Sequence, residues 1–206
     1  GLYKATGDNE MAREYFAKAL EVEESSGSDG RRTARASYVS NLAAVSRAAG
    51  DVDLARDQYC MALEHLRGMI PRSNEDVEAA LSKEEASMYG LDGDTSTSGH
   101  GHEPPPNMLG EGGSLNVAAS VLNNLGLLFK SIGRLHAARR CYVRAISLGG
   151  VALGAHSPSI ALRLRNLGAV LLQLGYRDLA VERLTKAHGS CSLGYGADHP
   201  ETVMCA

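Results

Sequence analysis

The chain has 206 residues, of which 44% are hydrophobic, and a formal net charge of −3 at pH 7. This charge lacks the basic excess of a nucleic-acid-binding domain or a polybasic membrane anchor, and no apolar stretch is long enough to cross a bilayer. Only 5% of the residues are aromatic and none is Trp, which disfavours strands. We therefore expect an all-α protein. No targeting signal follows Gly1, so a cytoplasmic location is only the default expectation.

Four segments superpose when the chain is aligned with itself, at residues 4–22, 47–65, 130–148 and 172–190. Each has a turn glycine, then a small residue, a large residue and an alanine at steps of five, four and three. In chain order these are Gly7, Ala12, Phe16 and Ala19; Gly50, Ala55, Tyr59 and Ala62; Gly133, Ala138, Tyr142 and Ala145; and Gly175, Ala180, Leu184 and Ala187. Steps of four and three keep residues on one helical face. The pattern predicts amphipathic helices whose alanines allow a neighbouring helix to approach closely.

A second pattern precedes three of these turns, in YVSNLAAVSRAAG, VLNNLGLLFKSIG and RLRNLGAVLLQLG. It aligns Asn41, Asn124 and Asn166. The repeating unit is thus a helix A, a turn with glycine at the helix end, and a helix B. Because neither helix can bury its apolar face alone, we expect antiparallel pairs stacked into an α-solenoid.

The organisation along the chain is repeat, insert, repeat. Residues 1–70 hold repeats, the first one truncated, and residues 115–206 hold repeats that end in the start of a further helix. Residues 71–114 are an insert, predicted as a weak helix from Ser73 followed by a flexible Gly- and Pro-rich loop over 90–114. Both ends cut through a repeat, so we expect a piece of a longer array.

The combined pattern NLG…G…A…Y…A resembles the tetratricopeptide repeat family. The spacing of 43 residues from Gly7 to Gly50 and 42 from Gly133 to Gly175 exceeds the ordinary repeat of about 34 and is similar to that of the kinesin light chain. Pro158 and Pro200 suit the first position of the next helix A, with Ser157 as the N-cap of the former.

Residues that could carry chemistry do not form a recognisable site. The four cysteines, Cys60, Cys141, Cys191 and Cys205, are at least fourteen residues apart, so we expect buried or half-buried free thiols. His100 and His102 have no third metal ligand at a suitable spacing. The glycine-rich segment 149–154 has no Lys-Ser or Lys-Thr after it, and we interpret it as a turn between repeats. We expect no metal, no cofactor and no catalysis.

The family resemblance implies that the A helices line a concave groove. The residues expected to face it are Ser37, Ser40, Asn41, Ala44 and Arg47; Ser120, Asn123, Asn124, Leu127 and Lys130; and Leu162, Arg165, Asn166, Ala169 and Gln173. This set contains cations and no acid. The candidate partner-binding residues are Asn41, Arg47, Asn123, Asn124, Lys130, Arg165 and Asn166.

Such a face suits an acidic, extended protein segment, because amides bond its backbone and cations attract its carboxylates. The alternative for Asn41, Asn124 and Asn166 is a purely structural hydrogen bond between helices. The two-Asn, one-Lys arrangement of carboxylate-clamp relatives is not reproduced, so chaperone C-termini are not predicted. We expect a non-catalytic scaffold that binds proteins and not nucleic acid, membrane or a small-molecule substrate. The alternative function is a structural subunit held permanently in a large assembly.

Overall fold

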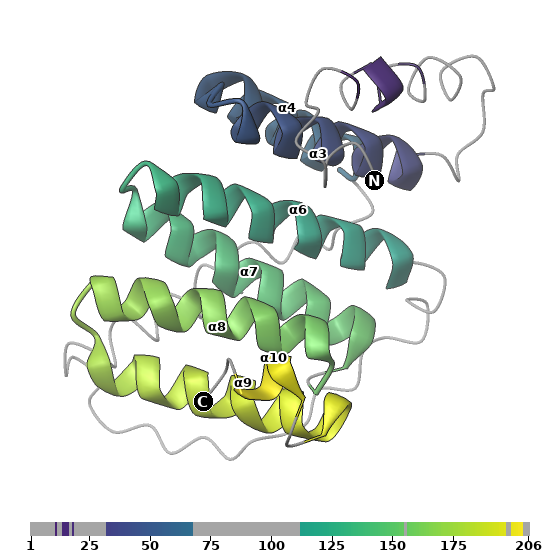
Figure 1. The fold of residues 1–206 in the computed structure, drawn as a ribbon. Helices are drawn as coiled ribbons and strands as arrows, with labels where there is room; N and C mark the ends of the chain where they lie inside the picture. Colours follow the sequence, from purple (N-terminus) through teal and green to yellow (C-terminus); the bar gives the residue numbers. More distant parts are fainter. Residues whose placement is uncertain are drawn as a thin grey trace, which may run out of the picture.

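The fold is known from a computed structural model, which describes residues 11, 14–16, 18, 32–67, 112–154, 156–196 and 199–203 (Figure 1). Every regular element within these residues is a helix, which confirms the all-α prediction. The elements are α3 (Arg32–Ala48), α4 (Val52–His65), α6 (Gly112–Ser131), α7 (Leu135–Leu153), α8 (Pro158–Gln173), α9 (Arg177–Tyr195) and α10 (Pro200–Val203).

The helices pack in successive hairpins, α3 with α4, α6 with α7 and α8 with α9. The hairpins lie one below the next in Figure 1, with α4 against α6 and α7 against α8. The A helices of the repeat are therefore α3, α6 and α8, and the B helices are α4, α7 and α9. This arrangement confirms the predicted solenoid.

Each hairpin turns at a glycine with a positive φ: 88° at Gly50, 74° at Gly133 and 87° at Gly175. The N–H of the following residue donates back across the turn, as from Asp51 to the Ser46 carbonyl over 3.0 Å. Only glycine adopts this conformation without a steric cost, so the three predicted cap glycines are confirmed. Gly7 lies outside the described residues.

The core is built from the small and large residues of the repeat. The alanines at both repeat positions are fully buried in every described hairpin, as are Tyr59 and Tyr142. A Cβ added to Gly126 of α6 would lie 2.7 Å from Cε1 of Tyr142, and one added to Gly168 would lie 2.7 Å from Cγ of Leu184. The large residue of helix B thus packs directly on the backbone of helix A, as the small residues predicted.

The start of α8 confirms the predicted cap. The Ser159 N–H donates to Oγ of Ser157 over 3.3 Å, and Pro158 occupies the first helical position. A helix also begins at Pro200, where the sequence predicted one. The buried Thr202 of α10 lies one 42-residue repeat after the buried Ile160 of α8, so α10 takes the same place in the repeat as the first turn of α8.

We interpreted the glycine-rich segment 149–154 as a turn between repeats, and this prediction is wrong. Helix α7 continues to Leu153, and only Gly154, with φ of 82°, ends it. Gly149 is buried against Ile160 and Arg163 of α8, and this packing outweighs the low helix propensity of glycine.

Helix α6 also begins earlier than predicted, at Gly112, inside the expected loop. Two contacts hold its first turn: Oγ of Ser114 is 2.8 Å from Oγ1 of Thr33, and Leu115 is buried. The rest of the predicted insert, residues 71–111, lies outside the described residues, as do residues 1–10.

Candidate functional site on the A helices

The A helices lie next to one another along the array. Consecutive A helices contact one another, α3 with α6 and α6 with α8, and they do so more extensively than consecutive B helices. A stack that is tighter on one side curves toward that side. The exposed parts of α3, α6 and α8, here called the A-helix face, are therefore the candidate binding surface.

The A helices carry basic residues and no acidic ones. They contain no Asp or Glu, although the whole chain has a net charge of −3. Their six cations are Arg32, Arg35, Arg47, Lys130, Arg163 and Arg165. Two of the described B helices carry acids, Asp53, Asp57 and Glu64 on α4 and Asp178 and Glu182 on α9, whereas the B helix α7 has Arg139, Arg140 and Arg144 and no acid.

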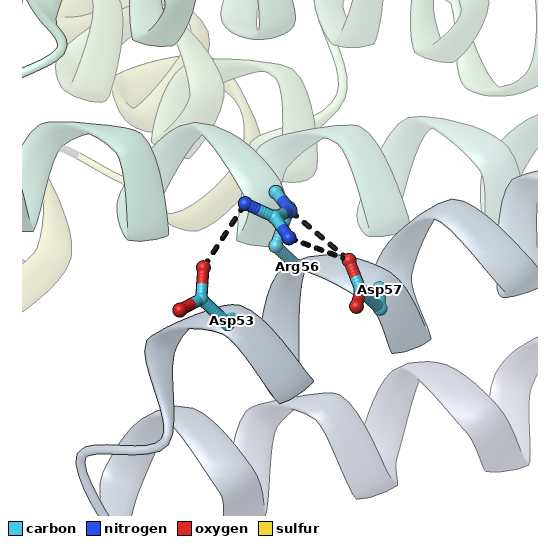
Figure 2. Close-up of polar contacts among 3 residues, drawn as sticks. All are labelled: Asp53, Arg56 and Asp57. Atoms are coloured by element: carbon cyan, nitrogen blue, oxygen red, sulfur yellow. Dashed lines mark hydrogen bonds and ion pairs between the residues drawn. The ribbon is translucent and has the colours of Figure 1, made fainter.

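On helix α4 a cation is neutralised within its own helix. Figure 2 shows Arg56 between Asp53 and Asp57, with its Nη1 3.0 Å from Oδ1 of Asp53 and its Nη2 2.9 Å from Oδ1 of Asp57. No cation of an A helix can be compensated in this way, because its own helix offers no carboxylate. Basic residues without an acid on the same helix are therefore found on all three A helices and on the B helix α7.

The predicted asparagines have different environments. Nδ2 of Asn166 donates to Oδ1 of Asn123 over 3.0 Å, which joins α8 to α6. Asn123 is buried, Asn124 is half-buried and Asn41 is exposed. Asn166 thus makes the interhelical bond that we considered as an alternative, and its partner is Asn123 rather than the aligned Asn124. Asn41 and Asn124 remain candidates for contact with a partner.

The predicted cations are half-buried rather than fully solvent-facing. Burial raises the pKa of Tyr59 and of Tyr142, and the positive charge of Arg47 counteracts this rise at both phenols. Arg47 therefore lies near the junction of two hairpins. Lys130 lies in the last turn of α6, where a cation interacts favourably with the helix dipole. Nη1 of Arg165 is enclosed by protein.

Sequence reasoning missed Arg163, which is only 4% exposed. Its Nη2 donates to Oγ of Ser120 over 3.2 Å and to Oδ1 of Asn116 over 3.4 Å, both on α6. In the repeat alignment Arg163 takes the place of Tyr38 and Val121, three residues before the aligned asparagine. A charged residue at a position that is otherwise apolar was the signal that could have identified it.

The described cysteines, Cys60, Cys141 and Cys191, are free thiols. Burial raises the pKa of Cys141 to about 11, and Cys191 is buried, as predicted. Cys60 is exposed, contrary to our prediction, because it lies on the solvent side of α4 beside the buried Tyr59. Cys205, His100 and His102 lie outside the described residues.

Among the described residues, no group of three or more His, Cys, Asp or Glu side chains is arranged to hold a metal ion. None of the helices in the described ranges combines the length and apolar character that a membrane span requires.

Stacked helical hairpins, each closed by a cap glycine, define an α-solenoid of the kind that binds other proteins. Residues 117–192 match a family model described as tetratricopeptide repeat, and residues 2–26 match a second model with the same description. These two segments are therefore similar to tetratricopeptide repeats, and the fold is the α-solenoid that such repeats form. A comparison with curated proteins found no match.

Proposed function

We propose that the A-helix face binds an acidic, extended segment of a partner protein. The observation that carries the proposal is the charge of α3, α6 and α8, which together contain six Arg or Lys residues and no Asp or Glu. Opposite charges on the two partners would guide the encounter and select against basic segments. The long repeat period of 42 residues from Gly133 to Gly175 supports a place among long-repeat proteins similar to the kinesin light chain.

Polar groups on the same face would fix the register of the bound segment. The exposed Asn41 and the half-buried Asn124 offer amides that can donate to and accept from an extended backbone. The Asn166–Asn123 bond fixes the spacing of α8 and α6 and so the distance between neighbouring subsites. Because five of the six cations are partly or fully exposed, we expect weak to moderate affinity that falls as salt is added.

A structural subunit of a larger assembly is the second candidate. Helix α9 supports it, because Val181 is 61% exposed and Leu193 is 75% exposed. Large apolar side chains at this level of exposure suit a surface that another subunit covers. A fixed stoichiometric set of co-purifying proteins supports this function, whereas an exchangeable set supports an adaptor.

Charge reversal at Lys130 tests the proposed surface. Lys130→Glu is preferred to a change at Arg165, whose Nη1 is enclosed and whose replacement would disturb packing. The matched control is Arg140→Glu, the same change of charge at an exposed residue of the B helix α7. The probe is a fluorescein-labelled peptide of alternating Glu and Ser, compared with a Gln and Ser peptide by fluorescence anisotropy.

We expect Lys130→Glu to weaken binding of the Glu peptide several-fold, on the order of 1 kcal/mol, because one attraction becomes a repulsion in a partly screened site. Arg140→Glu should bind nearly as the unmodified protein does, and the Gln peptide should bind weakly to all three. Equal weakening by both variants would indicate only a general charge effect. An unchanged affinity in Lys130→Glu would place the binding surface elsewhere.

A further inference from the structure

Arg163 is a buried cation, and its hydrogen-bond partners lie on α6, a helix without a carboxylate side chain. It lies on α8 and contacts α6 and α7, and none of these three helices contains Asp or Glu. Removal from water disfavours the charged form, so burial lowers the pKa of Arg163, but a guanidinium stays charged at neutral pH. A buried charge of this kind normally has an opposite charge beside it.

The hydrogen bonds of Arg163 only partly replace such a partner. Its two bonds, at 3.2 Å to Ser120 and 3.4 Å to Asn116, are longer than the 2.7 to 2.9 Å typical of a guanidinium bonded to a carboxylate. Both acceptors are neutral. Its Nη1 is buried and has no hydrogen-bond partner among the described residues. The guanidinium therefore has unused capacity for an anionic acceptor.

The preceding repeat shows that the fold does not need this charge. One repeat earlier, the positions of Gly149 and Arg163 hold Leu66 and Val121, which are both fully buried in one apolar cluster. A Cβ at Gly149 would overlap Nη1 of Arg163, so the glycine provides the space that the long side chain fills. A leucine and a valine have thus been replaced by a glycine and an arginine, and the arginine side chain reaches into the space at the glycine.

We propose that Arg163, with Ser120 and Asn116, forms a subsite on the A-helix face for one carboxylate of an acidic protein segment. This inference rests on the proposed function and names a specific contact within it. Ser120 is exposed and Asn116 is half-buried, so a carboxylate can approach from the side of α6. The single charge of Arg163 matches one carboxylate rather than a phosphate group with a charge near −2. A guanidinium also bonds a carboxylate more strongly than it bonds the neutral oxygens of Ser120 and Asn116.

A double variant, Gly149→Leu with Arg163→Val, tests the subsite because it recreates the Leu66 and Val121 pair of the preceding repeat. Replacing a buried charge by well-packed apolar residues is often neutral or stabilising, so the double variant should fold and melt at or above the temperature of the unmodified protein. We expect its affinity for the Glu and Ser peptide to fall at least tenfold, because a poorly solvated cation attracts a carboxylate more strongly than an exposed one does. Arg140→Gln, which removes an exposed cation from α7, is the matched control and should change the affinity little.

A second variant protects the test against a folding failure. Arg163→Gln keeps a long polar side chain beside Asn116 and Ser120 but removes the charge, and it should show a similar loss of affinity. Glu-peptide binding at the unmodified level by both variants would overturn the subsite. If those two variants bind normally while Lys130→Glu binds weakly, the subsite alone fails and the proposed function stands. If the unmodified protein does not bind the Glu peptide, both proposals fail.

Discussion

The interface of α4 with α6 and the interface of α7 with α8 are built on the same plan but differ at one place. Both contain a buried alanine and a buried tyrosine of the repeat, Ala55 and Tyr59 in one and Ala138 and Tyr142 in the other. Near the C-terminal end of helix B, the first interface contains the apolar pair Leu66 and Val121, whereas the second contains Gly149 and Arg163. The shared residues set the geometry of the hairpins, and the pair that differs is free to acquire a function.

The largest effect should come from the part that the two interfaces share. Tyr59→Ala and Tyr142→Ala should each lower the free energy of unfolding by roughly 3 to 5 kcal/mol, as is typical when a fully buried aromatic side chain is removed. This is a large share of the stability of an ordinary domain. Urea unfolding followed by circular dichroism measures both values, and we expect them to agree within about 1 kcal/mol.

Tyr142→Phe is the control for that comparison. The Tyr142 hydroxyl is buried and has no hydrogen-bond partner among the described residues, so its removal should change stability little. If Tyr142→Ala costs much less than Tyr59→Ala, the two interfaces do not share one packing plan.

A smaller and asymmetric effect is expected at the pair that differs. Leu66→Ala should cost roughly 2 to 5 kcal/mol because it leaves a cavity, whereas Gly149→Ala should cost roughly 1 to 3 kcal/mol because it forces Arg163 and Ile160 to move. Adding Arg163→Val to Gly149→Ala should recover most of that loss. The same urea titrations measure this recovery.

Gly150→Ala is the matched control for Gly149→Ala. A Cβ at Gly150 meets no atom within 4 Å, so alanine should leave stability unchanged or raise it by about 0.5 to 1 kcal/mol through its better helix propensity. A similar loss at positions 149 and 150 would show that crowding against Arg163 is not the cause.

The regular part of the fold was predictable because the same cap and packing residues recur in each repeat. Gly50, Gly133 and Gly175 stand where a helix must end in a left-handed residue, and Ser157 with Pro158 marks a helix start by local hydrogen bonding alone. These features depend on a few neighbouring residues. The end of α7 was not predictable in this way, because Gly149 stays helical through its contact with α8.

The candidate site was predicted less completely, because it too depends on contacts between different helices. The family resemblance pointed to the A helices and their cations, but the bond between Asn166 and Asn123 joins residues 43 positions apart, on different helices. Arg163 was assigned to no role because its depth of burial and its contacts with Ser120 and Asn116 depend on the packing of three helices. Pairwise contacts of this kind become visible only when the hairpins are stacked.

The most direct test of the central claim is to locate the bound acidic segment on the protein. Amide chemical shifts of the isotopically labelled chain can be followed during titration with the Glu and Ser peptide, and the Gln and Ser peptide provides the reference. We predict that the changes concentrate on α3, α6 and α8, with prominent shifts around Lys130 and Arg163. Changes that concentrate instead on α4, α7 and α9 would contradict the A-helix face as the binding surface.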